Sequence, residues 1–389
     1  MRAGAVAAVA DDLTGAAELA AVGWRRGLEA EVHTETGWPP LAPLTVLDTD
    51  SRTRGESAAR ARSRSAAAWL AARRADLVYR KVDSVLRGWV RPELEELLAG
   101  LGWGRALIVP ANPGLGRVIR DGRYYVEGRP VHETDFARDP RHPIRSSDVL
   151  AMLGEGGATA AVVSRVGPAA LADGLTIGEA ASRDDLVSWA GRVEEGLLAA
   201  GAAEFFDVLL EARGLALRTP APAPAAPGSS ERRLFVSGTT SDCGREALQR
   251  ARDRGFPVRP IPTDLFHDRG LPADRVQGWA EDVLAAVGRS PAVVVTIDRP
   301  VSNDPGDARR LEGLLADVVE RVVQRQAVNE IFVEGGATAA TVIRRLGWTR
   351  LTVLREIAPG VVSLRPDSPH APPLTMKPGS YAWPEAVWG

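Results

Sequence analysis

The chain has 389 residues, of which 45% are hydrophobic and 25% charged, and its formal net charge at pH 7 is -2. The length predicts two domains, and the balanced charge argues against nucleic acid or a membrane as the main partner. The single cysteine, Cys243, excludes an intrachain disulfide and fits a reducing compartment, so we expect a cytoplasmic protein.

The N-terminal segment MRAGAVAAVADD predicts a first buried strand rather than a secretory signal. Its apolar run is short, and Asp11 and Asp12 close it. No stretch of the chain approaches the about 20 apolar residues that span a membrane.

The first part of the chain alternates apolar strands with helices. Strand patterns occupy residues 5–12, 29–34, 44–51, 77–84 and 105–112, and helical patterns lie between them at 14–26, 55–74 and 90–99. This alternation predicts an α/β domain with a mainly parallel sheet flanked by helices. The segment 122–134 predicts a hairpin that turns at Glu127 and Gly128.

A segment rich in proline and alanine, residues 218–233, predicts an extended linker between domains at 1–217 and 234–389. The second part repeats the strand-to-loop pattern at 232–241, 291–300, 329–340 and 350–360. Two α/β domains of this kind predict a small-ligand site in a cleft between them.

Polar side chains concentrate where the predicted strands of the first domain end, which is where open parallel sheets bind ligands. Arginines suit a carboxylate or phosphate, and carboxylates suit sugar hydroxyls and can accept a proton from one. The simplest ligand for both is a small polyhydroxy acid. A helix cap remains an equally good interpretation of the first three residues of this set. The set comprises Asp11, Asp12, Thr14, Ser51, Arg52, Lys81, Asp83, Ser84, Arg87 and Arg117.

The second domain offers turns rich in glycine, serine and threonine at 236–241, 334–340 and 376–382. Such turns expose backbone N–H groups at a helix N-terminus, a favourable place for phosphate. Among the 48 basic residues, Lys81 and Lys377 are the two lysines, and both lie in these polar segments.

Other functions receive less support. The chain contains no G-x-x-x-x-G-K-[ST] motif, which excludes a Walker-type NTPase. His132, Asp135, Asp139 and His142 are close in sequence, but prolines interrupt the segment, and we expect no metal site there. The arginine-rich helix at residues 52–74 is expected to be a solvated face rather than a nucleic-acid surface.

Taken together, the motifs resemble the four-carbon acid sugar kinase family, in the family's order and over nearly the whole chain. The resemblance implies an N-terminal domain that binds a sugar acid and a C-terminal domain that binds ATP, with Mg²⁺ as cofactor and a homodimer as a possible assembly. The motifs are ADDLTGAAE (10–18), DTDSR (48–52), KVDSVLRG (81–88), GLGR (114–117), residues 125–149, VSGTTS (236–241), EGGATAATVIRRLG (334–347) and the tail at 359–380.

The resemblance also implies which residues line the two sites, and the roles given to them here are our hypothesis. Asp12 would be the general base, with Asp83 in reserve, while Arg52 and Arg87 hold the acid's carboxylate and Lys81 neutralises charge near the transferred phosphoryl group. Ser84 joins these residues in the acid pocket, and Asp11, Thr14, Ser51 and Arg117 lie beside it. The nucleotide would be held by Ser237, Gly238, Thr239, Gly335, Gly336, Thr338, Lys377 and Gly379.

The second domain departs from the family pattern in three places. Ala337 stands where the family usually has an acidic residue, Gly244 and Ala247 replace a usual Thr and Gln, and the tail reads KPGSYA. Two alternatives therefore stay open beside the kinase. The protein could be a catalytically silent sugar-acid binding protein, or a kinase with a changed acceptor. Neither the acid nor the phosphorylated hydroxyl follows from the sequence.

Overall fold

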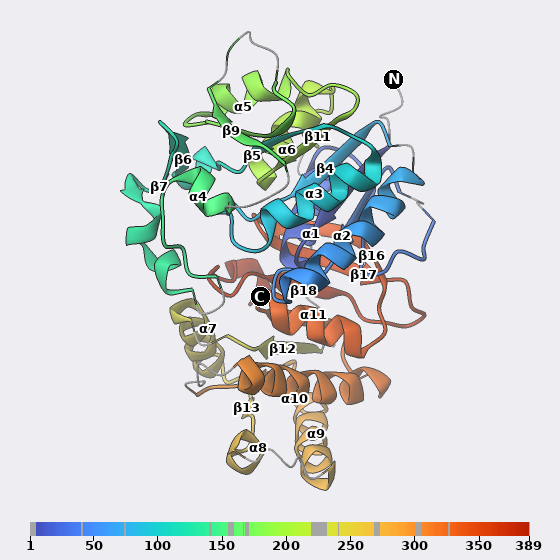
Figure 1. The fold of residues 1–389 in the computed structure, drawn as a ribbon. Helices are drawn as coiled ribbons and strands as arrows, with labels where there is room; N and C mark the ends of the chain where they lie inside the picture. The colour runs from blue at the N-terminus through green and yellow to red at the C-terminus, as the bar shows by residue number, and fades with distance from the viewer. Residues whose placement is uncertain are drawn as a thin grey trace. The chain divides into compact units, whose positions relative to one another are not determined.

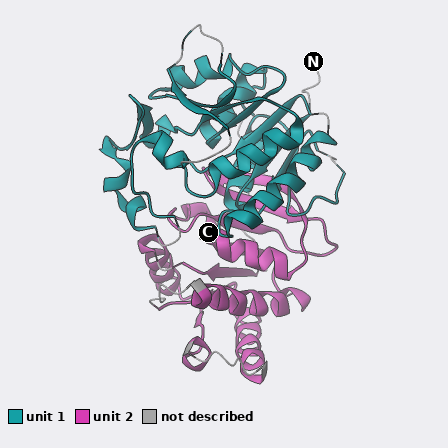
Figure 2. Cartoon of the chain, viewed as in Figure 1, with its two compact units in different colours: residues 1–219 teal, residues 220–389 magenta. Residues whose placement is uncertain are grey.

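The computed structural model describes residues 5–39, 42–73, 75–139, 142–154, 159–165, 167, 171–218, 232–239, 241–267, 273–299, 305–325 and 327–388. The chain divides into two compact units, residues 1–219 and 220–389 (Figure 2). The expected linker at 218–233 lies, except for its terminal residues, outside the described ranges.

The first unit is built on a sheet in the order β2-β3-β1-β4-β11-β5-β10-β9, and its neighbouring strands run parallel. Most of these strands are buried along their whole length, as sheets covered on both faces require. They are β1 (Val6–Ala10), β2 (Ala30–His33), β3 (Leu44–Asp48), β4 (Leu77–Lys81), β5 (Arg105–Val109), β9 (Ala161–Ser164), β10 (Gly174–Gly178) and β11 (Leu197–Gly201).

Helices cover both faces of this sheet (Figure 1). Leu47 of β3 belongs to the core beneath α2 and α3, whereas Leu44 packs against α1, so these helices lie on opposite faces. A Cβ at Gly23 would lie 2.2 Å from Leu44, so glycine permits the close approach of α1. The helices are α1 (Leu13–Arg25), α2 (Glu56–Ala71), α3 (Val90–Leu101), α4 (Val149–Leu153), α5 (Arg183–Ala190) and α6 (Ala203–Ala212).

A small antiparallel sheet follows β5. It contains β6 (Arg117–Arg120), β7 (Arg123–Val126) and β8 (Arg129–Pro130). The predicted turn at Glu127 and Gly128 is confirmed, with φ of 50° and 79°, as a tight hairpin turn requires. The preceding turn, at Asp121 and Gly122, has the same geometry and was not predicted. Short 3₁₀ helices at Pro113–Leu115, Val131–Glu133 and Asp135–Arg138 flank this sheet.

The second unit has a sheet in the order β13-β14-β12-β15-β18-β17-β16. Neighbours from β13 to β18 are parallel, whereas β17 is antiparallel to both β18 and β16. The strands are β12 (Arg233–Ser237), β13 (Val258–Pro260), β14 (Ala292–Thr296), β15 (Glu330–Glu334), β16 (Arg350–Ala358), β17 (Val361–Pro366) and β18 (Leu374–Lys377). The helices are α7 (Asp242–Asp253), α8 (Thr263–His267), α9 (Ala273–Val287), α10 (Pro305–Gln324) and α11 (Gly336–Arg345).

Aromatic side chains form part of the core of the second unit. The ring of Phe235 stacks on Phe332 at 4.7 Å and on Trp388 at 5.2 Å between centroids. Trp383 meets Phe332 edge-on at 5.8 Å. These contacts tie the C-terminal residues to the centre of the sheet.

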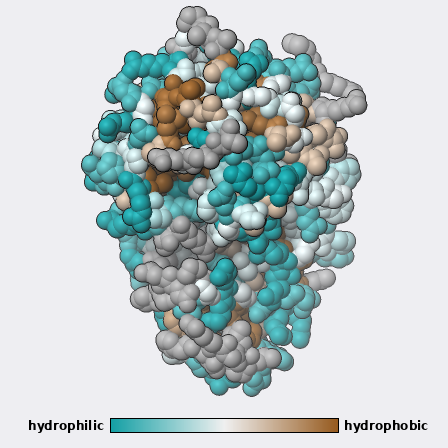
Figure 3. Space-filling view, viewed as in Figure 1, coloured by the Kyte–Doolittle hydropathy of each residue, from teal (hydrophilic) through white to brown (hydrophobic). Residues whose placement is uncertain are grey.

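The surface shown in Figure 3 is mainly hydrophilic, with hydrophobic residues in small patches. In the part of the chain that the structure describes, the large exposed apolar side chains are those of Trp38, Leu115, Leu150, Val162, Val187 and Leu217. Among the described residues, no helix is both long enough and apolar enough to cross a membrane.

Candidate active site

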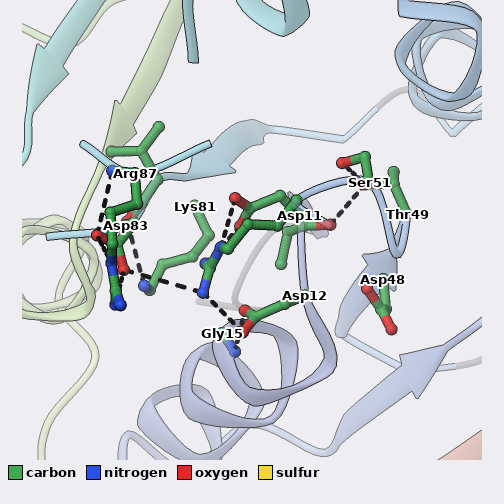
Figure 4. Close-up of polar contacts among 12 residues, drawn as sticks. Asp11, Asp12, Gly15, Asp48, Thr49, Ser51, Lys81, Asp83 and Arg87 are labelled. Atoms are coloured by element: carbon green, nitrogen blue, oxygen red, sulfur yellow. Dashed lines mark hydrogen bonds and ion pairs between the residues drawn. The ribbon is translucent and has the colours of Figure 1, made fainter. Parts of the chain in front are cut away.

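Asp11 and Asp12 follow β1, and one arginine binds both of them. The guanidinium of Arg52 donates to the two carboxylate oxygens of Asp11 at 2.9 and 2.7 Å and to Asp12 Oδ2 at 2.8 Å. Asp12 caps α1, because its Oδ1 accepts a hydrogen bond from the Gly15 amide at 2.9 Å (Figure 4). The Asp11 side chain is 2% exposed and that of Asp12 is 27% exposed, so Asp12 is the carboxylate within reach of a ligand.

Asp83 and Arg87 form a second ion pair after β4. Arg87 donates to Asp83 through Nε at 3.0 Å and through Nη2 at 2.8 Å. A third bond, from Nη1 to Asp139 at 2.9 Å, ties Arg87 to the segment after the small sheet. Arg52 Nη1 lies 3.9 Å from Asp83 Oδ1, so the two ion pairs are neighbours.

Lys81, the last residue of β4, lies in the same cluster (Figure 4). Its Nζ donates to the Val82 carbonyl at 3.1 Å and lies 3.3 Å from Glu18 Oε2 of α1. A Cβ at Gly15 would lie 3.2 Å from Lys81 Cγ, so the side chain runs along the first turn of α1. We refer to Asp11, Asp12, Arg52, Lys81, Asp83 and Arg87 as the charged rim.

Ser84 and Arg117 meet beside the charged rim. Arg117 Nη1 donates to Ser84 Oγ at 2.5 Å, and the Tyr124 hydroxyl donates to the Ser84 carbonyl. The ring of Phe136 lies 5.3 Å from the guanidinium of Arg87 and 5.4 Å from that of Arg117. The small antiparallel sheet and the segment after it therefore hold these two arginines in place.

Two predicted residues lie apart from the charged rim. Ser51 is completely buried, where its Oγ donates to Glu93 and lies 2.9 Å from Thr49 Oγ1. Thr14 is half-buried in the first turn of α1, and within the described ranges its side chain makes no hydrogen bond to the rim.

Asp12 and Asp83 ionise differently. Burial raises the pKa of the Asp12 carboxyl above its ordinary value, although the charge of Arg52 opposes the rise and that of Asp11 adds to it. Burial also acts on Asp83, but there the charges of Arg87 and Arg52 outweigh it and hold the pKa below its ordinary value. A carboxylate with a raised pKa is the better proton acceptor, which favours Asp12 as a base.

Sequence reasoning missed two charged residues beneath the rim. Arg80 of β4 and Glu93 of α3 are 2% and 0% exposed, and they form an ion pair. A charged residue inside the apolar strand LVYRK was the available signal for Arg80. The sequence offered less indication that Glu93 is buried, because α3 contains several glutamates. Only the packing shows which glutamate is buried.

The side chains of His132, Asp135, Asp139 and His142 contact other protein groups. Asp135 pairs with Arg138, Asp139 with Arg87, and His142 Nε2 donates to the Arg52 carbonyl at 2.7 Å. Within the described ranges, no three His, Cys, Asp or Glu side chains lie where they could hold a metal ion together.

The arginine-rich helix α2 forms ion pairs with acidic residues: Arg60 pairs with Glu56, Glu95 and Glu96.

The glycine-rich turns of the second unit lie close together. A Cβ at Gly238 would lie 1.9 Å from Thr338 Oγ1, and one at Gly379 would lie 2.9 Å from Thr239 Oγ1. Gly335 has φ of 103° and precedes α11, which Gly336 begins. No side chain caps α11, whereas Ser241 caps α7 through the Gly244 amide at 3.1 Å. The α11 N-terminus therefore has backbone N–H groups available for an anion.

Lys377 is completely buried in this unit. Its Nζ lies 2.5 Å from Glu334 Oε1 and 3.3 Å from the Pro378 carbonyl, and Glu334 Oε2 accepts a hydrogen bond from Ser237 at 2.9 Å. Burial lowers the pKa of Lys377, although the charge of Glu334 opposes the shift. The acidic residue of this turn is thus Glu334, three positions before Ala337, and it already neutralises the lysine.

Comparison with known proteins bears on both units. A sugar-binding N-terminal domain model matches residues 6–202, and a nucleotide-binding C-terminal domain model matches residues 234–381. The 3-oxo-tetronate kinase of Methylobacterium radiotolerans is 30% identical and aligns with 97% of this chain and 96% of its own. The D-threonate kinase of Cupriavidus necator is 29% identical, over 98% and 95% of the two chains.

Solved structures share the fold. A Salmonella typhimurium LT2 protein superposes with a TM-score of 0.80 at 19% identity, covering 97% of this chain and 96% of that one. A Haemophilus influenzae protein of family DUF1537 gives a TM-score of 0.72 at 19% identity, covering 98% of each chain.

The fold and the two family models define a class of two-domain α/β proteins in which one domain binds a sugar and the other a nucleotide. Within that class, the chain belongs to the four-carbon acid sugar kinase family.

Proposed function

We propose that the protein transfers a phosphoryl group from ATP to a hydroxyl of a small sugar acid of the tetronate or 3-oxo-tetronate type. Relatives named as 3-oxo-tetronate and D-threonate kinases align over nearly the whole chain, which supports this acceptor class. The observation that carries the proposal is the partly exposed Asp12 carboxylate, paired with Arg52 at the carboxyl end of the sheet.

Asp12 is the proposed general base. Its carboxylate accepts the proton of the acceptor hydroxyl, whose oxygen then bonds to the γ-phosphorus of ATP. The bond from that phosphorus to the β–γ bridging oxygen breaks, and ADP leaves. The raised pKa of Asp12 suits this role.

Arg52 and Arg87 are the proposed partners of the acceptor's carboxylate. Each guanidinium has five N–H donors, of which the described contacts occupy three. The remaining donors can bind a carboxylate in a planar, two-bond geometry. Lys81, near Asp12 and Asp83, is proposed to offset the negative charge of the transferred phosphoryl group.

The nucleotide phosphates are proposed to bind at the uncapped N-terminus of α11, beside the turn after β12. Backbone N–H groups at Gly336 and Thr338 supply the donors, whereas the Gly335 amide donates to the Lys377 carbonyl at 3.1 Å and lines the turn beside them. A phosphate contact by Lys377 is also part of the proposal, and it requires this lysine to exchange Glu334 for the nucleotide.

Mg²⁺ is proposed to enter with ATP. The described residues provide no cluster of three metal ligands, which fits an ion held mainly by phosphate oxygens and water. The ion would neutralise charge on the phosphates, and the roles given to the protein side chains do not depend on it.

A coupled ADP-release assay against tetronates, 3-oxo-tetronates and longer sugar acids tests the function. With the best acceptor, Asp12→Asn should lower kcat about 10²–10⁴-fold, because the base is lost while the cap to Gly15 can persist. Asp135→Asn, at a side chain 93% exposed, is the control and should leave kcat unchanged.

Near-normal turnover of Asp12→Asn would show that Asp12 is not the base. Absence of ADP release with every acid, together with no change in thermal stability on adding ATP, would instead favour a sugar-acid binding protein.

A further inference from the structure

A buried layer of charge lies beneath the charged rim. Glu93 of α3 is 0% exposed, and its two carboxylate oxygens have different partners. Oε1 accepts a hydrogen bond from Ser51 Oγ, and Oε2 forms an ion pair with Arg80 Nη2. A fully buried carboxylate is costly unless it is paired, so these two contacts determine where Glu93 can sit.

Arg80 connects Glu93 to the rim. Its side chain is 2% exposed, and its Nη1 donates to the carbonyls of Val9 at 3.3 Å and Lys81 at 2.5 Å. The same nitrogen lies 4.0 Å from Asp11 Oδ1. Arg80 therefore joins the carboxyl ends of β1 and β4 and places a positive charge behind Asp11.

The charges alternate from this layer to the rim. Glu93 pairs with Arg80, Arg80 lies beside Asp11, Asp11 binds Arg52 with two hydrogen bonds, and Arg52 reaches Asp12. Burial would raise the pKa of Asp11, but the charges of Arg52 and Arg80 outweigh it and hold the pKa below its ordinary value. Asp11 therefore stays ionised and keeps both hydrogen bonds from Arg52.

Glu93 also contacts the residue that precedes Arg52 in the chain. Ser51, which donates to Glu93, immediately precedes Arg52, and its Oγ lies 2.9 Å from Thr49 Oγ1. The loop after β3 is thus anchored to α3 at the residue next to the rim arginine. Two independent contacts, through Arg80 and through Ser51, lead from Glu93 to Arg52.

We propose that Glu93 is a positioning residue for acceptor binding: it holds Arg80 and Ser51, and through them Asp11 and Arg52, in the arrangement that binds the sugar acid's carboxylate. This inference rests on the proposed function. Glu93 itself is placed out of reach of a ligand, because its side chain is only 1% exposed.

Glu93→Gln tests the proposal, because the amide keeps the shape of the side chain and removes its charge. Arg80 then has one negative neighbour instead of two, and it draws Asp11 away from Arg52. We expect the KM for the sugar acid to rise about 10-fold or more, whereas the KM for ATP stays within about twofold. KM does not depend on the fraction of active molecules, so partial misfolding does not imitate this split.

Glu96→Gln is the matched control. Glu96 lies on the same helix with its side chain 17% exposed, and it pairs with Arg60 and Arg64 of α2 rather than with the rim. Both KM values should be unchanged in this variant. An unchanged acid KM in Glu93→Gln, or an equal rise in both KM values, would overturn the proposal.

A double variant tests the route through Arg80. If Glu93 acts mainly through Arg80, Glu93→Gln combined with Arg80→Met should have an acid KM close to that of Arg80→Met alone. If the double variant instead raises the acid KM by the product of the two single-variant effects, Glu93 does not act through Arg80. If Glu93→Gln does not fold, Ser51→Ala probes the other contact and should also raise the acid KM, and an unchanged value would count against the proposal.

The wild-type protein is assayed in the same series. If it phosphorylates no sugar acid, the proposed function fails and the role of Glu93 falls with it. If the wild type is active and the variants behave like it, only the role of Glu93 is wrong.

Discussion

Buried carboxyls in the first unit have pKa values that are shifted in opposite directions. Asp48, the last residue of β3, is 4% exposed and accepts one hydrogen bond, from the Asp50 amide at 2.8 Å. Burial raises its pKa to about 8, since that hydrogen bond lowers the pKa by less than burial raises it. Asp11, equally buried, stays ionised because Arg52 and Arg80 lie beside it. The neighbouring cations, not burial alone, decide which carboxyl keeps its charge.

Asp48→Asn is expected to change how stability depends on pH. Folded Asp48 binds a proton up to about pH 8, whereas the unfolded chain releases it near the ordinary value of 3.8. Between these values the folded state binds more protons, so the contribution of Asp48 to stability falls as pH rises toward 8. The variant lacks this proton, and its Tm relative to the wild type should increase from about pH 5 to about pH 8.

Thermal unfolding over a pH series measures this difference. Glu56→Gln, at a side chain 45% exposed in the first turn of α2, is the control for removing a carboxylate. A Tm difference between Asp48→Asn and wild type that stays constant across the series would contradict the expected proton uptake.

The sequence could predict the residues of the rim but not the contacts among them. Asp12 and Asp83 lie at the ends of predicted strands and Arg52 directly follows one, and the carboxyl ends of parallel strands meet at one edge. The partners of Arg80 and Glu93 depend on how α3 packs against β4, which no local pattern encodes. Strand ends are local features, whereas a buried ion pair is a tertiary one.

At the scale of elements, small residues decide how closely the turns of the second unit approach. The turn after β12 and the first turn of α11 meet at Gly238 and Thr338. Gly238 has no side chain, which leaves room for the Thr338 hydroxyl. Both turns have the composition expected of phosphate-binding loops, but their contact depends on the pairing of β12 with β15.

Gly238→Ala should destabilise the protein and weaken nucleotide binding. The added Cβ would lie 1.9 Å from Thr338 Oγ1 and 2.9 Å from Thr338 Cβ, so one turn must move. We expect a loss of about 1–3 kcal/mol, as for other overpacked sites. Denaturant-induced unfolding and ATP titration measure the two effects.

Gly278→Ala is the matched control for this substitution. Gly278 lies within α9, where an added Cβ meets nothing within 4 Å, and alanine favours the helix by about 0.5–1 kcal/mol. The control should therefore be slightly more stable than wild type. Equal effects of the two substitutions would show that the contact between Gly238 and Thr338 is unimportant.

At the scale of the whole molecule, each unit has its own hydrophobic core. The core of the first unit includes residues of β1, α2 and α3, and that of the second includes Phe235, Phe332 and the C-terminal tryptophans. The family models fall on the same two parts, residues 6–202 and 234–381. We therefore expect each ligand to protect the backbone amides of one unit from hydrogen exchange.

The homodimer stays a prediction, which sedimentation of the purified protein checks.

Hydrogen exchange of the full chain measures this protection. ATP should slow exchange in the turns at 237–239 and 335–338, and a sugar acid should slow it at 11–15 and 81–87. Each ligand at about 100 times its Kd should also stabilise the protein by about 2.7 kcal/mol. ATP protection confined to the first unit would contradict the nucleotide site, and sugar-acid protection confined to the second would contradict the acid site.

By itself, the sequence determined the α/β class, the positions of β1–β5 and α1–α3 in the first unit, and the polar strand ends that resemble sugar-acid kinases. These features are local, because the hydrophobic period and the turn residues carry them. Only the tertiary structure decided that β17 runs antiparallel, that Lys377 is buried against Glu334, and that Glu93 lies beneath the rim. Strand direction and buried charge pairing depend on residues distant in the chain, and packing alone brings them together.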